Sequence, residues 1–97
     1  MRSTAEYITL LRQFKENNMQ LYGIKQLGVF GSVARGEQHE DSDIDICVEL
    51  ESAELFKMVH LKEDLQELLN VKVDLVRLRD TMDSFLRKRI EKDGLYV

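Results

Sequence analysis

The sequence predicts an α/β fold, more narrowly an α+β domain with a small mixed sheet of three to four strands and helices packed on one face. Three observations favour it. Segments with helical spacing of apolar residues alternate with short apolar runs, and a long connection joins two of those runs. The composition of the 97 residues, 43% hydrophobic and 33% charged, is typical of one compact domain of soluble type. We therefore expect residues 1–97 to form a single domain without repeats or a linker.

The first element is expected to be a helix. Ser3 or Thr4 can cap its start, and Gly23 can end it, because helices often finish at a left-handed glycine. Its apolar positions recur at helical spacing and are Tyr7, Leu10, Leu11, Phe14 and Met19. A short apolar strand, Ile24–Phe30, should follow directly.

A short helix and a polar loop should then return the chain to the sheet. The strand runs into Gly31-Ser32, and we expect a helix from Ser32 to about Gly36. Residues 37–41 are all polar or charged, which is typical of an exposed loop. The second strand is expected over 43–50, where polar and apolar residues alternate.

The next elements should be a crossover helix and a third strand. The helix is expected from Ala53 to Leu69, with Asn70 closing it. Its apolar face is expected to consist of Leu55, Met58, Leu61, Leu65, Leu68 and Leu69. The third strand is expected over 71–76. The connection is long enough for a right-handed crossover, so the second and third strands should be parallel.

The C-terminal segment is expected to form a last helix over about 80–92 and a short edge strand over 95–97. The residues that this helix should offer to the core are Met82, Phe85, Leu86 and Ile90. These two elements would complete the sheet and its helical cover.

Two acids in the second strand are the strongest sign of chemistry. Asp43 and Asp45 should project from one face of the strand, roughly 6 to 7 Å apart. At an effective dielectric of about 20 their repulsion is on the order of 2 to 3 kcal/mol, which a divalent cation would turn into attraction. Turn chemistry explains an aspartate at the start of a strand. Asp45, however, lies inside an apolar strand, where an acid lowers β propensity, and it therefore indicates a ligand.

A third acid should join them. Asp74 lies with Lys72 on the polar face of the third strand, opposite the core. Neighbouring parallel strands would then bring Asp43, Asp45 and Asp74 to one point. Oxygen-only ligands of this kind suit Mg²⁺ or Mn²⁺ better than zinc.

Charge and composition argue against a nucleic-acid-binding protein and against a membrane protein. A net charge of −4 and a pI near 5.2 disfavour binding of extended nucleic acid, which needs a basic face. No apolar run approaches the roughly 18 residues of a membrane span, and the N-terminus lacks an apolar signal core, so a cytoplasmic protein is expected. Cys47 fits that compartment and is interpreted as a packing residue. His39 and His60 have no partners at metal-ligand spacing.

The spacing of these residues resembles that of a known family. Gly31-Ser32-Val33-Ala34-Arg35-Gly36, Asp43-Ile44-Asp45 and the later Asp74 are similar to the motifs of the polymerase-beta-like nucleotidyltransferase superfamily. The short length and the run Ser42-Asp43-Ile44-Asp45-Ile46 resemble, more narrowly, the minimal nucleotidyltransferases. Members of that group include the antitoxins of HEPN/MNT toxin–antitoxin pairs. The resemblance covers nearly the whole chain.

The resemblance implies a catalytic site. Asp43 and Asp45 would bind two Mg²⁺ ions, with Mn²⁺ as the other candidate, and Asp74 would complete the triad on the catalytic ion. Asp74 would also orient or deprotonate the incoming hydroxyl. Gly31 and Ser32 would hold the nucleotide triphosphate, with ATP as the expected substrate. Glycine lets the backbone approach phosphate, and the serine supplies a hydroxyl and an amide at a helix N-terminus.

Three groups of basic residues have two interpretations each. Arg35 either reaches a phosphate or pairs with Asp41 or Glu37, and the structural role is favoured. Lys72 either offsets charge at the site or is a solvated edge residue. The Arg87–Arg89 cluster is interpreted, like most charge runs, as solvated surface.

Three functions follow. The first is an enzyme that moves AMP from ATP, or more generally NMP from NTP, to a hydroxyl. The resemblance implies that this hydroxyl is a tyrosine of a partner HEPN ribonuclease toxin, and the chain would then be an antitoxin. The second is a binding antitoxin that occludes the toxin without catalysis. The third is a transferase for a small molecule or an RNA end, against which the small size and the lack of a basic face both argue. The sequence is compatible with both a homo-oligomer and a hetero-oligomer.

Overall fold

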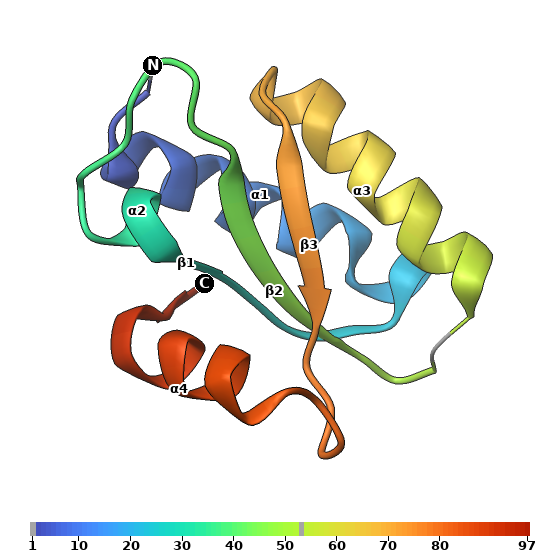
Figure 1. Cartoon of the computed structure of the whole chain (residues 1–97). Helices are drawn as coiled ribbons and strands as arrows, with labels where there is room; N and C mark the ends of the chain where they lie inside the picture. The colour runs from blue at the N-terminus through green and yellow to red at the C-terminus, as the bar shows by residue number, and fades with distance from the viewer. Residues whose placement is uncertain (1, 53) are drawn as a thin grey trace.

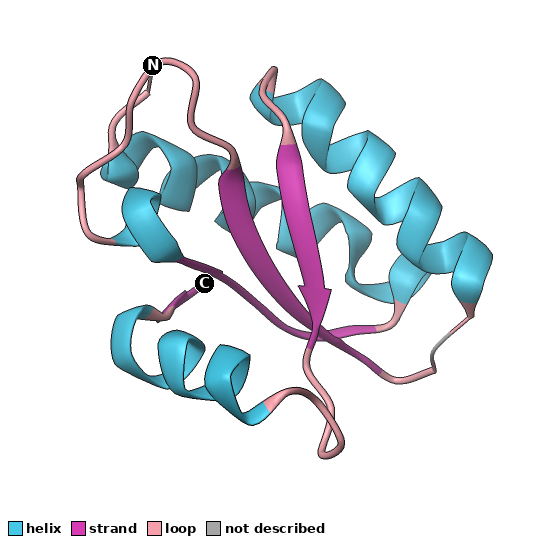
Figure 2. Cartoon of the chain, viewed as in Figure 1, coloured by secondary structure: helices cyan, strands magenta, loops and turns pink. Residues whose placement is uncertain are grey.

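A four-stranded mixed sheet forms the centre of the molecule, for which a computed structural model describes residues 2–52 and 54–97. The elements are α1 (Thr4–Tyr22), β1 (Ile24–Phe30), α2 (Gly31–Ala34), β2 (Ile44–Leu50), α3 (Leu55–Leu69), β3 (Val73–Arg77), α4 (Ser84–Asp93) and β4 (Leu95–Tyr96). The strand order is β3-β2-β1-β4 (Figures 1 and 2). β2 and β3 are parallel, whereas β1 is antiparallel to both β2 and β4. The predicted mixed sheet and its parallel pair are confirmed.

The ends of α1 and α3 have the predicted caps. The Ser3 hydroxyl accepts a hydrogen bond from the Glu6 amide, and the Glu6 carboxylate accepts one from the Ser3 amide, which is a capping box. Gly23 ends α1 at φ 65°, and Asn70 ends α3 at φ 54°, both in the left-handed region. None of the helices in the described residues is long and apolar enough to cross a membrane.

The helices occupy both faces of the sheet. α1 and α3 cover the face with the larger core, whose buried residues are Tyr7, Leu11, Phe14, Tyr22, Ile24, Leu27, Val29, Val33, Ile44, Ile46, Val48, Leu50, Leu61, Leu65, Leu69 and Val73. α4 lies against the opposite face, where Ile90 packs on Phe30 and Cys47. Side chains alternate between faces along a strand, so Phe30 and Cys47 form a second apolar patch that needs its own cover. This second layer is added to the predicted arrangement, in which helices cover one face.

Several element boundaries differ from the predicted ones. β2 begins at Ile44, so Asp43 lies immediately before the strand. β3 begins two residues later than predicted, because the chain first has to turn back from the left-handed Asn70. α4 begins at Ser84 because the Asp83 carboxylate accepts hydrogen bonds from the amides of the first turn, 2.7 Å from Phe85 and 3.1 Å from Leu86. α2 starts at Gly31, one residue early, and β4 is two residues long.

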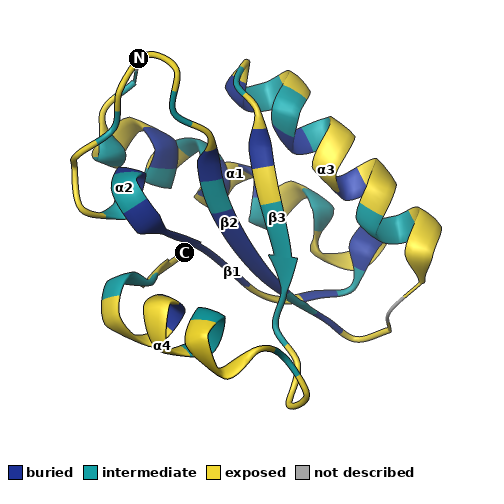
Figure 3. Cartoon of the chain, viewed as in Figure 1, coloured by how far each residue is buried: buried dark blue, intermediate teal, exposed yellow. Residues whose placement is uncertain are grey.

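Three residues assigned to the core by periodicity are exposed. Leu55 is 77% exposed, Phe85 80% and Met19 44%. Figure 3 shows that exposed residues dominate the outer sides of α3 and α4, while buried residues line β1 and β2. Leu55 and Phe85 lie in the first turns of their helices, beyond the reach of the sheet. Ala53, the predicted start of α3, lies outside the described residues.

Candidate active site

Two of the three predicted acids face each other across β2 and β3. Asp45 and Asp74 are register partners in this parallel pair, in which neighbouring strands lie about 4.8 Å apart. Their strand neighbours Ile46 and Val73 point into the larger core. The two carboxylates therefore lie on the opposite face, which α4 covers in part. Asp45 is half-buried and Asp74 is exposed.

This arrangement changes the titration of Asp45. Burial raises the pKa of its carboxyl group, and the nearby Asp74 raises it further through repulsion and through a hydrogen bond that favours the protonated form. Asp43 adds a smaller repulsion, and the positive charge of Arg89 acts in the opposite direction. A carboxylate in these surroundings is stabilised by a cation placed beside it.

Asp43 lies next to this pair without completing a metal cluster. It is exposed and precedes β2, so the strand ladder does not hold it. Among residues 2–52 and 54–97, no three His, Cys, Asp or Glu side chains are grouped closely enough to hold a metal ion. The structure thus brings Asp45 and Asp74 together and leaves Asp43 two residues before Asp45, outside the strand. Carboxylate oxygens, one of them on a half-buried group with a raised pKa, are a donor set that fits Mg²⁺.

Gly31 lies against the Asp45 carboxylate. Phe30, at the end of β1, pairs with Asp45, and Gly31 follows at φ 71°. A Cβ atom added at Gly31 would collide with Oδ2 of Asp45 and would lie 3.1 Å from its Cγ. Glycine meets both requirements here, the left-handed backbone and the close approach. Ser32 follows in α2 and is half-buried, so the predicted glycine–serine pair and the acid lie together.

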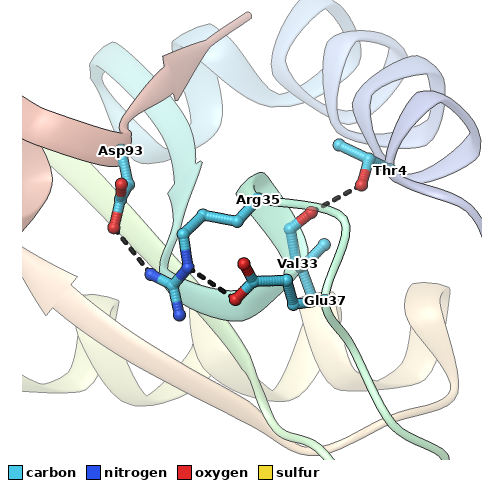
Figure 4. A network of polar contacts seen from close by, with 5 residues as sticks. All are labelled: Thr4, Val33, Arg35, Glu37 and Asp93. Atoms are coloured by element: carbon cyan, nitrogen blue, oxygen red, sulfur yellow. Dashed lines mark hydrogen bonds and ion pairs between the residues drawn. The ribbon is translucent and has the colours of Figure 1, made fainter.

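Polar contacts tie α2 to α1 and α4 (Figure 4). The Thr4 hydroxyl donates to the carbonyl of Val33 at 2.5 Å. Arg35 donates through Nε to Glu37 at 3.0 Å and through Nη1 to Asp93 at 2.7 Å. These two carboxylates, Glu37 first, raise the pKa of Arg35. The predicted pairing with Glu37 is confirmed, and Asp93 is an additional partner.

Breaking the Arg35–Asp93 contact should loosen α2. The amides of Arg35 and Gly36 bond to the carbonyls of Gly31 and Val33 within this short helix, so their hydrogen exchange reports its opening. We expect Asp93→Asn and Arg35→Ala each to accelerate exchange at both amides roughly threefold or more, with the double variant no faster than the singles.

The control for this experiment is Glu37→Gln, which removes an exposed partner and should have a smaller effect. Unchanged exchange in Asp93→Asn would mean that α2 does not depend on α4.

The other candidate residues of the sequence analysis are Cys47, Lys72 and the Arg87–Arg89 cluster. Burial raises the pKa of the Cys47 thiol to about 11, which is consistent with a packing role. Lys72 is exposed. In the basic cluster, Arg87 donates to the carbonyl of Arg79 at 2.6 Å, whereas the guanidinium carbon of Arg89 lies 5.7 Å from the centroid of the Phe30 ring. Nothing in the sequence pattern predicts this position of Arg89, because it depends on where α4 docks.

The chain is similar in sequence and fold to known proteins. The model of the nucleotidyltransferase domain family matches residues 11–97. Protein adenylyltransferase MntA of Thermococcus cleftensis is 37% identical over 98 residues, which cover 100% of this chain and 98% of that protein. A solved toxin–antitoxin structure with AMP-PNP has 27% identity and a TM-score of 0.75, over 91% of this chain and 69% of that one. A solved "putative minimal nucleotidyltransferase" has 36% identity and a TM-score of 0.70, over 91% and 93% of the two chains. The region matched by the family model contains both aspartates of the pair and the glycine–serine turn.

Proposed function

The chain belongs to the nucleotidyltransferase domain family, and on that premise we propose that it moves AMP from ATP to a tyrosine hydroxyl of a partner HEPN toxin and thereby acts as an antitoxin. The relative from Thermococcus cleftensis is named a protein adenylyltransferase and has the same length, within 2%. The solved toxin–antitoxin structure with AMP-PNP joins a similar chain to an ATP analogue and a toxin. We place this activity in the cytoplasm.

The observation that carries the proposal is the pairing of Asp45 with Asp74 beside Gly31. Asp45 and Asp74, with Asp43 next along the chain, are the residues that would hold Mg²⁺, or Mn²⁺ in its place. Two bound ions would stabilise the attacking and leaving oxygens of an in-line displacement at the α-phosphate. The backbone of Gly31 and the hydroxyl and amide of Ser32 would hold the triphosphate.

The reaction itself requires one nucleophile and one leaving group. The acceptor oxygen forms a bond to the α-phosphorus, and the bond from that phosphorus to the bridging oxygen of pyrophosphate breaks. The acceptor proton passes to Asp74, which is exposed and so open to an incoming side chain, or to water. Pyrophosphate leaves with the electron pair. A flexible tyrosine of a partner can reach such an open site without an acceptor domain in this chain.

Arg35 is the least supported of the candidate nucleotide-binding residues. Its guanidinium is engaged by Glu37 and Asp93, and binding to a phosphate would require it to give up at least one of them. We therefore assign Arg35 to positioning of α2, and the phosphate contacts to Gly31 and Ser32.

Intact-mass spectrometry tests the proposed function. The purified chain is incubated with Mg²⁺, ATP and a candidate HEPN partner, and both chains are weighed. We expect the partner to gain one or more AMP units, with no gain when Asp45→Asn replaces the parent chain. A stable complex without a mass gain would indicate an antitoxin that occludes its toxin. No gain and no complex would direct the search to a small-molecule or RNA acceptor.

A further inference from the structure

Arg89 lies beside the candidate site and forms no ion pair with the described residues. Its guanidinium carbon is 5.7 Å from the centroid of the Phe30 ring. Phe30 is the register partner of Asp45 and directly precedes Gly31. In the described part of the chain, no carboxylate lies within ion-pair distance of Arg89, and its side chain has no hydrogen bond.

The packing of α4 determines the direction of this side chain. Ile90 is buried against Phe30 and Cys47 on the site's face of the sheet. Asp93, one turn further along, is the residue that pairs with Arg35 of α2. Helical residues four apart share a face, so Arg89 lies on the same side of α4 as Asp93, the residue that contacts the end of α2. Figure 1 shows α2 and α4 as neighbours.

The other two cations of the cluster are placed differently. Arg87 donates to the carbonyl of Arg79, in the loop before α4. Lys88 is exposed and is rotated by about 100° from Arg89 around the helix, away from Phe30. Of the three, Arg89 is the one whose guanidinium lies over the Phe30 ring, next to Gly31.

Resting over an aromatic ring holds a guanidinium in place without using its hydrogen-bond donors. Arginine has five N–H donors in a planar fork that matches phosphate oxygens. The face of the Phe30 ring satisfies none of them, so all remain available to an anion. Arg35, the other arginine near the turn, has its donors engaged by two carboxylates.

We propose that Arg89 binds the β- and γ-phosphates of the nucleotide substrate. This assignment rests on the proposed function, because it deepens the same site. A triphosphate carries more negative charge than cations held by the acids would offset, and a guanidinium beside the acids adds one compensating positive charge. Arg89 would thus select triphosphates over monophosphates.

Isothermal titration calorimetry with two ligands tests the assignment. In the presence of Mg²⁺, the parent, Arg89→Gln, Arg89→Lys and Lys88→Gln are titrated with α,β-methylene-ATP, which cannot transfer AMP, and with AMP. Glutamine keeps much of the side-chain stem on Phe30 and removes the charge. Arg89→Gln should weaken binding of the triphosphate analogue roughly 10- to 100-fold, the range for loss of a charge-assisted contact, and leave AMP affinity within about twofold. Arg89→Lys should recover part of the loss, and Lys88→Gln should match the parent.

The other outcomes are distinguishable. If Arg89→Gln binds the triphosphate analogue as tightly as the parent, the assignment is wrong and the proposed function stands. If it binds both ligands equally weakly and melts at a lower temperature, Arg89 acts by packing α4, and the assignment is again wrong. If the parent binds neither nucleotide with Mg²⁺, both the assignment and the proposed function fail.

Discussion

Replacing Asp45 with Asn is expected to abolish AMP transfer and at the same time to make the metal-free protein harder to unfold. Asparagine has nearly the same shape but lacks the charge that Mg²⁺ requires of this position. The rate should fall on the order of 10²- to 10³-fold, as for other single groups that act on transition-state charge. The rise in stability should be at most about 1 kcal/mol, or a few degrees in Tm, because solvent screens a half-buried carboxylate.

The stability change should depend on pH in a defined direction. The pKa of Asp45 is raised in the folded protein, so the folded state keeps a proton that the unfolded state has already released. The free energy of unfolding of the parent should therefore fall as pH rises from about 4, the ordinary aspartate pKa, through the raised value. Asp45→Asn should lack this decline. Thermal melts between pH 4 and 7 in chelator would show both curves.

Glu49→Gln is the matched control for Asp45→Asn. Glu49 lies on the same strand and the same face, and it forms an exposed ion pair with Lys25 at 3.5 Å. Its replacement should leave both transfer and the pH dependence close to those of the parent. If Asp45→Asn instead melts well below the parent, the acid is structural and the site is misassigned.

Gly31→Ala should lose activity and stability together. The new Cβ would collide with the Asp45 carboxylate, and alanine is strained at φ 71°. The cost of the strained backbone and the displaced acid should be about 1–3 kcal/mol in the free energy of unfolding. Because the change displaces the acid and closes the approach to phosphate, AMP transfer should fall on the order of 10²-fold or more.

Gly36→Ala separates the two causes. Gly36 has the same φ of 71°, but a Cβ there meets no atom within 4 Å. It should therefore carry the backbone cost alone, about 1 kcal/mol, and keep most of the activity. In an Asp45→Ala background, where the collision is absent, the Gly31→Ala penalty should shrink to that of Gly36→Ala in chemical denaturation. A full penalty in that background would contradict the contact described here.

Local patterns and one topological rule suffice to predict the core of this site. Strict alternation places Asp45 and Asp74 on the non-core faces of their strands, and a right-handed crossover makes those strands parallel neighbours. The exact pairing of Asp45 with Asp74 agrees with both. Three acids were expected to converge, but only Asp45 and Asp74 pair among the described residues. Asp43 lies outside the hydrogen-bonded ladder.

Several parts of the site that could not be predicted depend on α4. Its start was expected at about residue 80, whereas the Asp83 carboxylate accepts hydrogen bonds from the first-turn amides and starts the helix at Ser84. Its docking on the second face follows from Phe30 and Cys47, which look like ordinary strand residues until their partners are placed. The positions of Arg89 and of the Arg35–Asp93 pair follow from that docking and from no local pattern.

The two-sided core also divides the molecule into a large part and a small part that can open separately. All buried residues of the larger core lie between Tyr7 and Val73, so an undocked α4 would leave that core packed. α4 itself, which carries Arg89 and Asp93, docks on a small patch around Phe30. Local opening of α4 would thus withdraw both residues from the site while the rest of the fold stays compact.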